Sequence, residues 1–211
     1  MRTGKEVSQK AFELWQNRAN ITYLYGAKGE IGTEEFVRNM FKRYPDYFKK
    51  YTDEVKELIV KECIGKRLFD CSGFVCYCAD IPDVYSGKLL DDCVYTTTDY
   101  HEGEVGWLAW KPGHVGIDRG DGTFLHMYAE LHTIEPCKFC EYNWQKQGKL
   151  KGVDYTKAEA ETEEYTVQSG DNLWKIASKY YGNGKEYKKI MEENHLQSDV
   201  INVGQKLVIP E

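Results

Sequence analysis

The sequence FDCSGFV at residues 69–75 surrounds the cysteine that is best placed to do chemistry in this chain. Asp70 is a residue type that caps helix N-termini, and apolar residues follow Cys71 at helical spacing, so Cys71 is predicted to open a buried helix. The unpaired N–H groups and the positive end of the helix dipole favour a thiolate at that position. We therefore expect Cys71 to be a nucleophile whose thiol pKa lies below the usual value of about 8.5.

A second stretch, GHVGIDRGDGTFLHM at residues 113–127, carries two histidines and reads as a β-hairpin. If the loop comprises Arg119 to Asp121, the pairing is symmetrical about Gly120 and His114 lies directly opposite His126. Any odd-length loop centred nearby keeps both histidines on one face, because side chains alternate with period two along a strand. One imidazole can then act as the base for the cysteine, and the other can hold that ring in the right tautomer and orientation.

The motifs DCSGF and GHVGI, with a second histidine twelve positions after the first, together resemble the signature of the NlpC-type cell-wall peptidases. These are papain-like cysteine enzymes that cut the peptides of bacterial peptidoglycan. The resemblance implies that Cys71 is the nucleophile, His114 the general base and then acid, and His126 the orienting third member. It also implies an α+β fold, with an antiparallel sheet packed on helices, and no metal or organic cofactor.

The bond implied by the resemblance is the γ-D-glutamyl to L-diamino acid bond of the peptide stem. Two alternatives stay open. The same triad could cut the N-acetylmuramoyl-L-alanine amide or catalyse transpeptidation, or the chain could be a non-catalytic wall-binding or phage-tail component. A lone DCSG motif or a lone hairpin histidine would be weak evidence, since buried cysteines are commonly inert. Their combination favours catalysis.

The segment before the cysteine contains a candidate oxyanion donor and an insertion. An amphipathic helix is predicted up to about Asn20, and the run that follows resembles a family segment whose tyrosine lines the active site. That tyrosine aligns with Tyr23, and the alternative is a core tyrosine. Residues 30–67 form a helical insertion, with helices predicted from Thr33 to before Pro45 and from Thr52 onward. The insertion either roofs the substrate groove, which we favour, or thickens the core.

The region after the nucleophile helix is predicted to be irregular up to the next strand. Residues 80–100 carry turn signals and read as loops, and residues 105–110 read as a buried strand. If His126 is not the orienting member of the triad, Glu130 is the candidate that could take that role. The polar residues near the hairpin are otherwise predicted to be solvated: His101, Asp118, Glu130 and His132.

Seven cysteines are present, so six remain once Cys71 is assigned to chemistry. Four of them could supply thiolates for zinc if their segments met. Two of these four, Cys76 and Cys78, lie two apart on one helix and so point to different faces. We favour reduced thiols, then disulfides, and rank zinc last. The four residues of that zinc alternative are Cys76, Cys78, Cys137 and Cys140.

Composition limits the partners. The net charge of −6 and pI near 5.5 argue against nucleic acid, since phosphate binding needs a basic face. No segment approaches the roughly 20 apolar residues of a membrane span, and the first residues lack the apolar core of an export signal. For a chain that acts on the cell wall, this leaves a phage or prophage lysin released after cytoplasmic synthesis, or a secreted protein whose leader has been removed.

The C-terminal quarter is predicted to be a separate unit. Residues 1–156 form the catalytic domain, residues 157–163 a charged linker, and residues 164–211 a β-α-α-β module. The pieces YTVQSGDNLWKIA and VGQKLVIP resemble a LysM module, which implies binding to the N-acetylglucosamine glycan of peptidoglycan. Trp174 falls on the buried stripe and is predicted to be core. The implied glycan contacts are Gly170, Asp171, Asn172, Leu173, Val200, Ile201 and Asn202.

Overall fold

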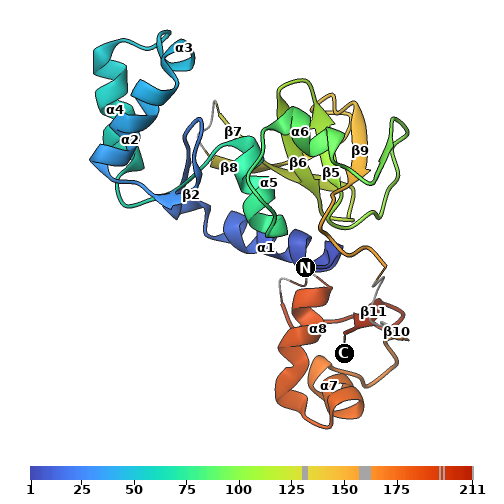
Figure 1. Ribbon diagram of the computed structural model, residues 1–211. Helices are drawn as coiled ribbons and strands as arrows, with labels where there is room; N and C mark the ends of the chain where they lie inside the picture. Colours follow the sequence, from blue (N-terminus) through green and yellow to red (C-terminus); the bar gives the residue numbers. More distant parts are fainter. Residues whose placement is uncertain (130–132, 157–162, 195, 197, 211) are drawn as a thin grey trace. The chain divides into compact units, whose positions relative to one another are not determined.

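The computed structural model describes residues 1–129, 133–156, 163–194, 196 and 198–210. The chain divides into two compact units, Met1–Thr156 and Lys157–Glu211 (Figure 1). Of the predicted linker, residues 157–162 lie outside the described residues, and Glu163 begins a strand. No helix in the described ranges is both long enough and apolar enough to cross a bilayer.

A six-stranded antiparallel sheet is the centre of unit 1, with strand order β4-β9-β5-β6-β7-β8. Helices α1 and α5 pack on this sheet and share its hydrophobic core. The predicted α+β class, an antiparallel sheet packed on helices, is confirmed. The elements of this layer are α1 (Gly4–Gln16), α5 (Cys71–Ala79), α6 (Ser86–Asp91), β4 (Tyr95–Thr97), β5 (Leu108–Lys111), β6 (His114–Asp118), β7 (Thr123–Tyr128), β8 (Thr133–Lys138) and β9 (Lys146–Lys149).

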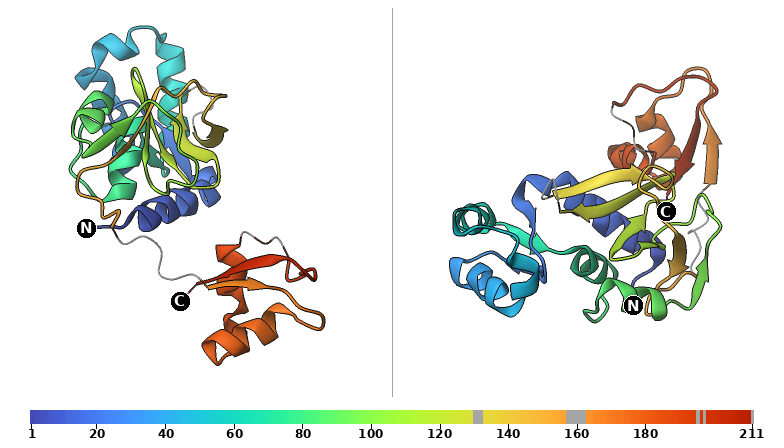
Figure 2. Two further views of the ribbon diagram at one scale, coloured as in Figure 1. Left: turned by 90° about the vertical axis from the view of Figure 1, so that its right-hand side faces the viewer. Right: turned by 90° about the horizontal axis from the view of Figure 1, so that it is seen from above.

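A small second sheet connects the main sheet to the helical insertion. Its order is β1-β3-β2, with β1 parallel and β2 antiparallel to β3. The insertion helices lie at one end of unit 1, beside β2 and β3 (Figures 1 and 2), and enclose a separate hydrophobic core. The elements are η1 (Arg18–Asn20), β1 (Ile21–Tyr23), β2 (Lys28–Ile31), α2 (Glu34–Arg43), α3 (Pro45–Phe48), α4 (Asp53–Cys63) and β3 (Arg67–Phe69).

Short polar residues define the ends of the insertion helices. Thr33 and Thr52 accept hydrogen bonds from the N–H groups of Phe36 and Val55, so both helices begin where the sequence predicts. The first helix ends before Pro45, whose missing N–H and fixed φ suit the first residue of α3.

The segment after α5 is more regular than predicted. Residues 80–100, expected to be loops, contain the helix α6 and the edge strand β4, which pairs with β9. The predicted strand at residues 105–110 begins only at Leu108. The first difference arises because α6 and β4 are short and β4 depends on pairing with the distant β9, which leaves little periodic pattern in the local sequence.

Unit 2 has the predicted β-α-α-β order and its own core, which includes Val167, Ile176 and Leu207. Its two strands pair antiparallel, and Asn194 joins the end of α8 to the last strand by exchanging hydrogen bonds with Val208. The elements are β10 (Glu163–Thr166), α7 (Leu173–Tyr181), η2 (Gly184–Glu186), α8 (Tyr187–Glu193) and β11 (Lys206–Ile209).

The expectation that Trp174 is a core residue is wrong. Its side chain is 51% exposed. The indole covers Gly184, where an added Cβ would lie 2.4 Å from the ring. The apolar stripe of α7 is completed by Leu173, Ile176 and Ala177, so the tryptophan falls just outside it.

Candidate active site

Cys71 is the first residue of α5, as predicted. The N-cap residue Asp70 has an extended backbone, and its Oδ1 accepts a hydrogen bond of 2.7 Å from the N–H of Gly73. The helix is buried on nearly every side, and the cysteine itself is 8% exposed. The sequence therefore places this thiol at a helix start, where the first backbone N–H groups have no partner within the helix.

The hairpin register differs from the predicted one. Ile117 pairs with Leu125 and Asp118 with Phe124, so the pairing is symmetrical about Asp121, one residue later than predicted. Continued along the strands, this register puts Gly116, and not His114, opposite His126. A Cβ on Gly116 would lie 3.1 Å from the Cβ of His126, so the glycine leaves room for that imidazole.

The two histidines nevertheless lie on one face, because His114 is two residues from Gly116, the position opposite His126, and residues two apart on a strand share a face. They are diagonal neighbours, and the Nε2 of His114 lies 2.9 Å from the Nδ1 of His126 in a hydrogen bond. The rings are perpendicular, with centroids 5.0 Å apart. The Trp144 ring stacks on that of His114, and the ring centroids of Tyr142 and His126 lie 4.2 Å apart. These aromatic side chains hold both imidazoles in place.

Burial keeps both imidazoles neutral. It lowers the pKa of His114 to about 4 and that of His126 to about 3, and the mutual repulsion of the two rings adds to the second effect. Two neutral rings can share one N–H, whereas two protonated rings would place donor against donor. In the tautomer with the Nε2–H of His114 donating to His126, the Nδ1 of His114 carries a lone pair and can accept a proton.

The environment of the thiol overturns the expectation of a lowered pKa. Burial raises the pKa of Cys71 to about 11, and the neighbouring Asp70 carboxylate acts in the same direction. The N–H groups of Val115 and Ser72 and the charge of Lys28 act in the opposite direction, but more weakly. A helix terminus alone lowers the pKa of a thiol, but here the cost of desolvating a buried thiolate is larger.

The thiol lies beside the start of β6. Cys71 donates to the carbonyl oxygen of Gly113, the residue before His114, at an S···O distance of 4.0 Å. No hydrogen bond joins the thiol to either imidazole within the described part of the chain. The structure thus brings the cysteine and the histidine pair to one place without a thiolate–imidazolium pair at rest.

Tyr23 ends β1 and lies close to Cys71. It pairs with Phe69, two residues before the cysteine. Burial raises the pKa of Tyr23, and the proximity of Cys71 adds to this effect, so the phenol stays protonated and can donate.

Sequence reasoning missed the partner of this tyrosine. The Tyr23 hydroxyl shares a hydrogen bond with Tyr47 of α3, so the insertion reaches the site. Tyr47 also stacks on Tyr25, with ring centroids 3.9 Å apart. Only the helix start at Pro45 marks this segment in the sequence.

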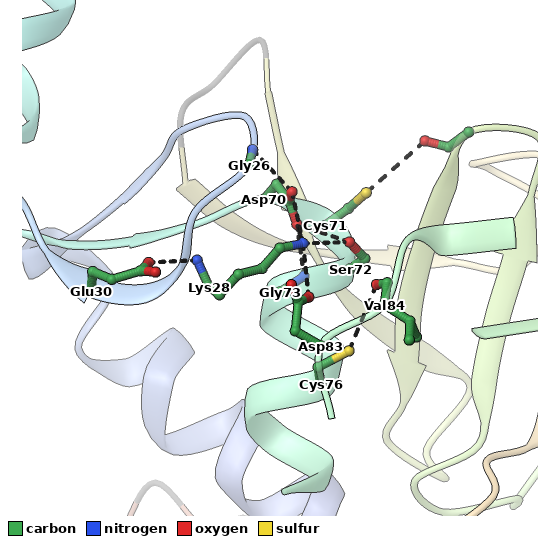
Figure 3. Close-up of polar contacts among 11 residues, drawn as sticks. Gly26, Lys28, Glu30, Asp70, Cys71, Ser72, Gly73, Cys76, Asp83 and Val84 are labelled. Carbon is green, nitrogen blue, oxygen red and sulfur yellow. Dashed lines mark hydrogen bonds and ion pairs between the residues drawn. The ribbon is translucent and has the colours of Figure 1, made fainter. Parts of the chain in front are cut away.

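A polar network behind the nucleophile was also missed. The Nζ of Lys28 lies 3.0 Å from both carboxylate oxygens of Asp70 and 2.9 Å from the Oγ of Ser72 (Figure 3). It forms a second ion pair of 3.1 Å with Asp83. Lysine commonly lies on the surface, so its residue type alone predicts a solvated side chain.

Asp118, predicted to be solvated, is fully buried. Its two carboxylate oxygens accept hydrogen bonds from the N–H of Gly120 and the side-chain amide of Gln147. Burial nevertheless raises its pKa to about 7. His101 is exposed and bonds Gln147 through its backbone. Glu130 and His132 lie outside the described residues.

All seven cysteines are free thiols. Those of the zinc alternative lie apart: Cys76 donates to the carbonyl of Val84, and Cys137 accepts from the Trp144 indole. In the described ranges no three His, Cys, Asp or Glu side chains are grouped so that they could hold a metal ion.

The implied glycan contacts of unit 2 lie in two loops and, for Leu173, at the first residue of α7. The two loops are joined beside Val167, whose backbone bonds residues 204 and 205. Asp171 accepts from the Tyr165 hydroxyl at 2.6 Å, and Asn172 caps α7. Leu173 is buried in the core of the unit, so its side chain is not available to a ligand, whereas Val200 is exposed.

Comparison with known proteins identifies one family. Residues 165–210 match the LysM domain. An uncharacterized protein of Deinococcus radiodurans is 55% identical over 47 residues, which are 22% of this chain and 19% of that protein. A probable N-acetylmuramidase of Lactococcus lactis subsp. lactis is 51% identical over 45 residues, or 21% and 10% of the two chains. The chain thus covers less than a fifth of the length of these relatives.

Solved structures are similar over most of the chain at low identity. NlpC1 from Trichomonas vaginalis has a TM-score of 0.43 and 14% identity, covering 69% of this chain and 44% of that chain. The peptidoglycan hydrolase RipB from Mycobacterium tuberculosis has a TM-score of 0.42 and 14% identity, covering 72% and 67%. The family match, together with the β-α-α-β order of unit 2, establishes that residues 165–210 are a LysM domain, at the C-terminal position that the sequence predicts.

Proposed function

We propose that this protein is a peptidoglycan hydrolase, in which unit 1 is a cysteine peptidase and the LysM domain holds it on wall glycan. One observation carries the proposal: a cysteine at the start of a buried helix contacts the residue that precedes His114, whose ring is hydrogen-bonded to a second histidine. Nucleophile, base and orienting group are the three parts that acyl transfer needs.

The pKa values determine how the proton moves. Cys71 is a neutral thiol at rest and His114 a neutral imidazole. In the proposed first step, the sulfur bonds the substrate carbonyl carbon while His114 takes the thiol proton. His114 then protonates the amine as the C–N bond breaks, which leaves a thioester on Cys71. Water, deprotonated by His114, hydrolyses this thioester and restores the thiol. His126 holds the ring and stabilises the cation that forms on it.

The oxyanion of each tetrahedral intermediate needs donors that are already in place. The backbone N–H of Cys71, which has no hydrogen-bond partner in the part of the chain that the structure describes, is one, and the Tyr23 hydroxyl is the other. Because burial raises the pKa of Tyr23, its proton stays available. The hydrogen bond with Tyr47 holds the phenol of Tyr23 at the edge of the substrate site. A phenol has one proton, so in the proposed step the Tyr23 hydroxyl turns to the oxyanion and accepts from Tyr47.

The preferred substrate is the peptide stem, cut between D-glutamate and the L-diamino acid. This choice rests on the resemblance of the DCSGF and GHVGI motifs. The LysM domain contributes by proximity, since tethering to the glycan raises the local concentration of stems without touching the chemistry.

The test is digestion of purified peptidoglycan, with released fragments identified by mass spectrometry. We expect fragments with a free amine on the diamino acid from the wild type, none from Cys71→Ala, and unchanged release from the matched control Cys140→Ser, whose thiol is exposed. Residues 1–156 alone should cut soluble muropeptides but work poorly on intact walls. Fragments with a free L-alanine amine would instead identify an amidase, and wall binding without any release would identify a binding protein.

A further inference from the structure

The ammonium group of Lys28 lies behind the nucleophile, in a niche lined by acidic and hydroxyl groups. Figure 3 shows it reaching from β2 to the first turn of α5. It contacts both Asp70 oxygens, the Ser72 hydroxyl and one Asp83 oxygen, all within 3.1 Å. The Lys28 side chain is 22% exposed and that of Asp70 10%, so water screens this ion pair only in part.

Backbone hydrogen bonds hold the segment before β2 against the start of α5. The N–H of Gly26 donates to Asp70, and the N–H of Asp70 donates to the carbonyl of Ala27. An added Cβ at Gly73 would lie 2.4 Å from that carbonyl oxygen and 2.7 Å from the Lys28 side chain. Glycine at this position therefore allows the chain before β2 to lie directly against the first turn of the nucleophile helix.

The same carboxylate that caps the helix works against the nucleophile. Asp70 is adjacent in sequence to Cys71, and its charge opposes ionisation of the thiol. Capping requires only the oxygen that accepts from the Gly73 N–H, and not the negative charge. That charge disfavours a thiolate at Cys71 unless another group offsets it. Lys28 is bonded to both oxygens of this carboxylate.

We propose that Lys28 is a positioning residue for Cys71: its ammonium group neutralises Asp70 and ties β2 to the start of α5, so that a thiolate can form beside a capping carboxylate. This inference rests on the proposed role of Cys71 as the nucleophile. Buried ion pairs add little to stability compared with apolar packing, so an electrostatic task explains a lysine here better than stability does.

Three titratable groups act on the thiol from the elements around it: Asp70 precedes α5, Lys28 comes from β2 and Tyr23 from β1. His114 follows Gly113, whose carbonyl the thiol contacts. Tyr23 and His114 stay uncharged between pH 7 and 9, because burial raises the pKa of the phenol and lowers that of the imidazole. In that range the charges that act on the thiol are those of Asp70 and Lys28, and Asp83 acts through its ion pair with Lys28.

The test measures alkylation of Cys71 by iodoacetamide between pH 7 and 9, resolved by peptide mass spectrometry because all seven cysteines are free. We expect Lys28→Met to slow alkylation about tenfold, since loss of a nearby cation raises a thiol pKa by about one pH unit. Lys28→Arg should stay near the wild-type rate. A lysine with a merely structural role would give the opposite sign, because a loosened helix exposes the thiol and speeds alkylation.

Two further variants keep the inference testable if Lys28→Met does not fold. Asp70→Asn retains a good helix cap and should speed alkylation, whereas the double variant Lys28→Met/Asp70→Asn should return to near the wild-type rate. Unchanged or faster alkylation of Lys28→Met, or an Asp70→Asn rate equal to the wild type, would overturn the inference. Because the reaction needs no substrate, a failure of wall digestion leaves this result standing and counts only against the proposed function.

Discussion

Acid should destabilise unit 1 through the two buried histidines of the hairpin. In the folded protein the pKa of His114 is about 4 and that of His126 about 3, against an ordinary value of 6.5. Because the folded values are lower, the unfolded chain takes up protons first as the pH falls. The stability that depends on these rings is therefore complete above pH 6.5 and is lost progressively below it.

The size of the effect follows from the unfolded value. At pH 5 both rings are still largely neutral in the folded protein but almost fully protonated in the unfolded chain. This difference in proton uptake lowers the free energy of unfolding by about 2 kcal/mol per histidine between pH 7 and pH 5, or about 3–4 kcal/mol for the pair. The exact folded values hardly matter, since both lie well below pH 5.

Asp118 works in the opposite direction. Its folded pKa of about 7 lies above the ordinary value of 3.8, so the folded protein takes up this proton first. Stability from this group is therefore gained as the pH falls from 7 towards 5, by about 2 kcal/mol, and is lost as the pH rises through 7. The wild-type curve mixes both effects, so only a comparison with a variant isolates the histidines.

The assay is urea unfolding at pH 7 and pH 5, followed by tryptophan fluorescence. Wild type and His114→Gln/His126→Gln are compared in a Trp174→Phe background, which leaves the four tryptophans of unit 1 as the signal. Between pH 7 and pH 5, the free energy of unfolding should fall by about 3–4 kcal/mol more in the wild type than in the double variant. Equal changes in both proteins would refute the conclusion that the fold holds this pair neutral.

Two further predictions concern residues around the nucleophile. Tyr23→Phe should lower kcat on soluble muropeptides about 100-fold with little change in KM, because an oxyanion donor acts in the transition state; an unchanged kcat would leave Tyr23 as a core residue. Gly73→Ala should lower the free energy of unfolding by about 1–3 kcal/mol in urea titrations, because its Cβ would lie 2.4 Å from the Ala27 carbonyl oxygen; a variant as stable as the wild type would mean that this contact relaxes without cost.

Features that depend on neighbours in the chain could be predicted from the sequence. Asp70 capping α5, Thr33 and Thr52 beginning the insertion helices, and the two histidines sharing a face all follow from local hydrogen bonds or from strand alternation. The shared face of the histidines was predicted correctly even though the centre of the hairpin moved from Gly120 to Asp121, because this move shifts each pairing partner by two residues.

The sequence by itself therefore determined which residues could be the nucleophile, the base and the orienting group, and the LysM match agrees with its reading of the C-terminal quarter. Only the tertiary structure decided the protonation of the site. The raised pKa of Cys71, the lowered pKa of His114 and the contacts of Lys28 and Tyr47 come from burial and from residues distant along the chain. Desolvation depends on everything that packs around a group, and no local pattern of residues records it.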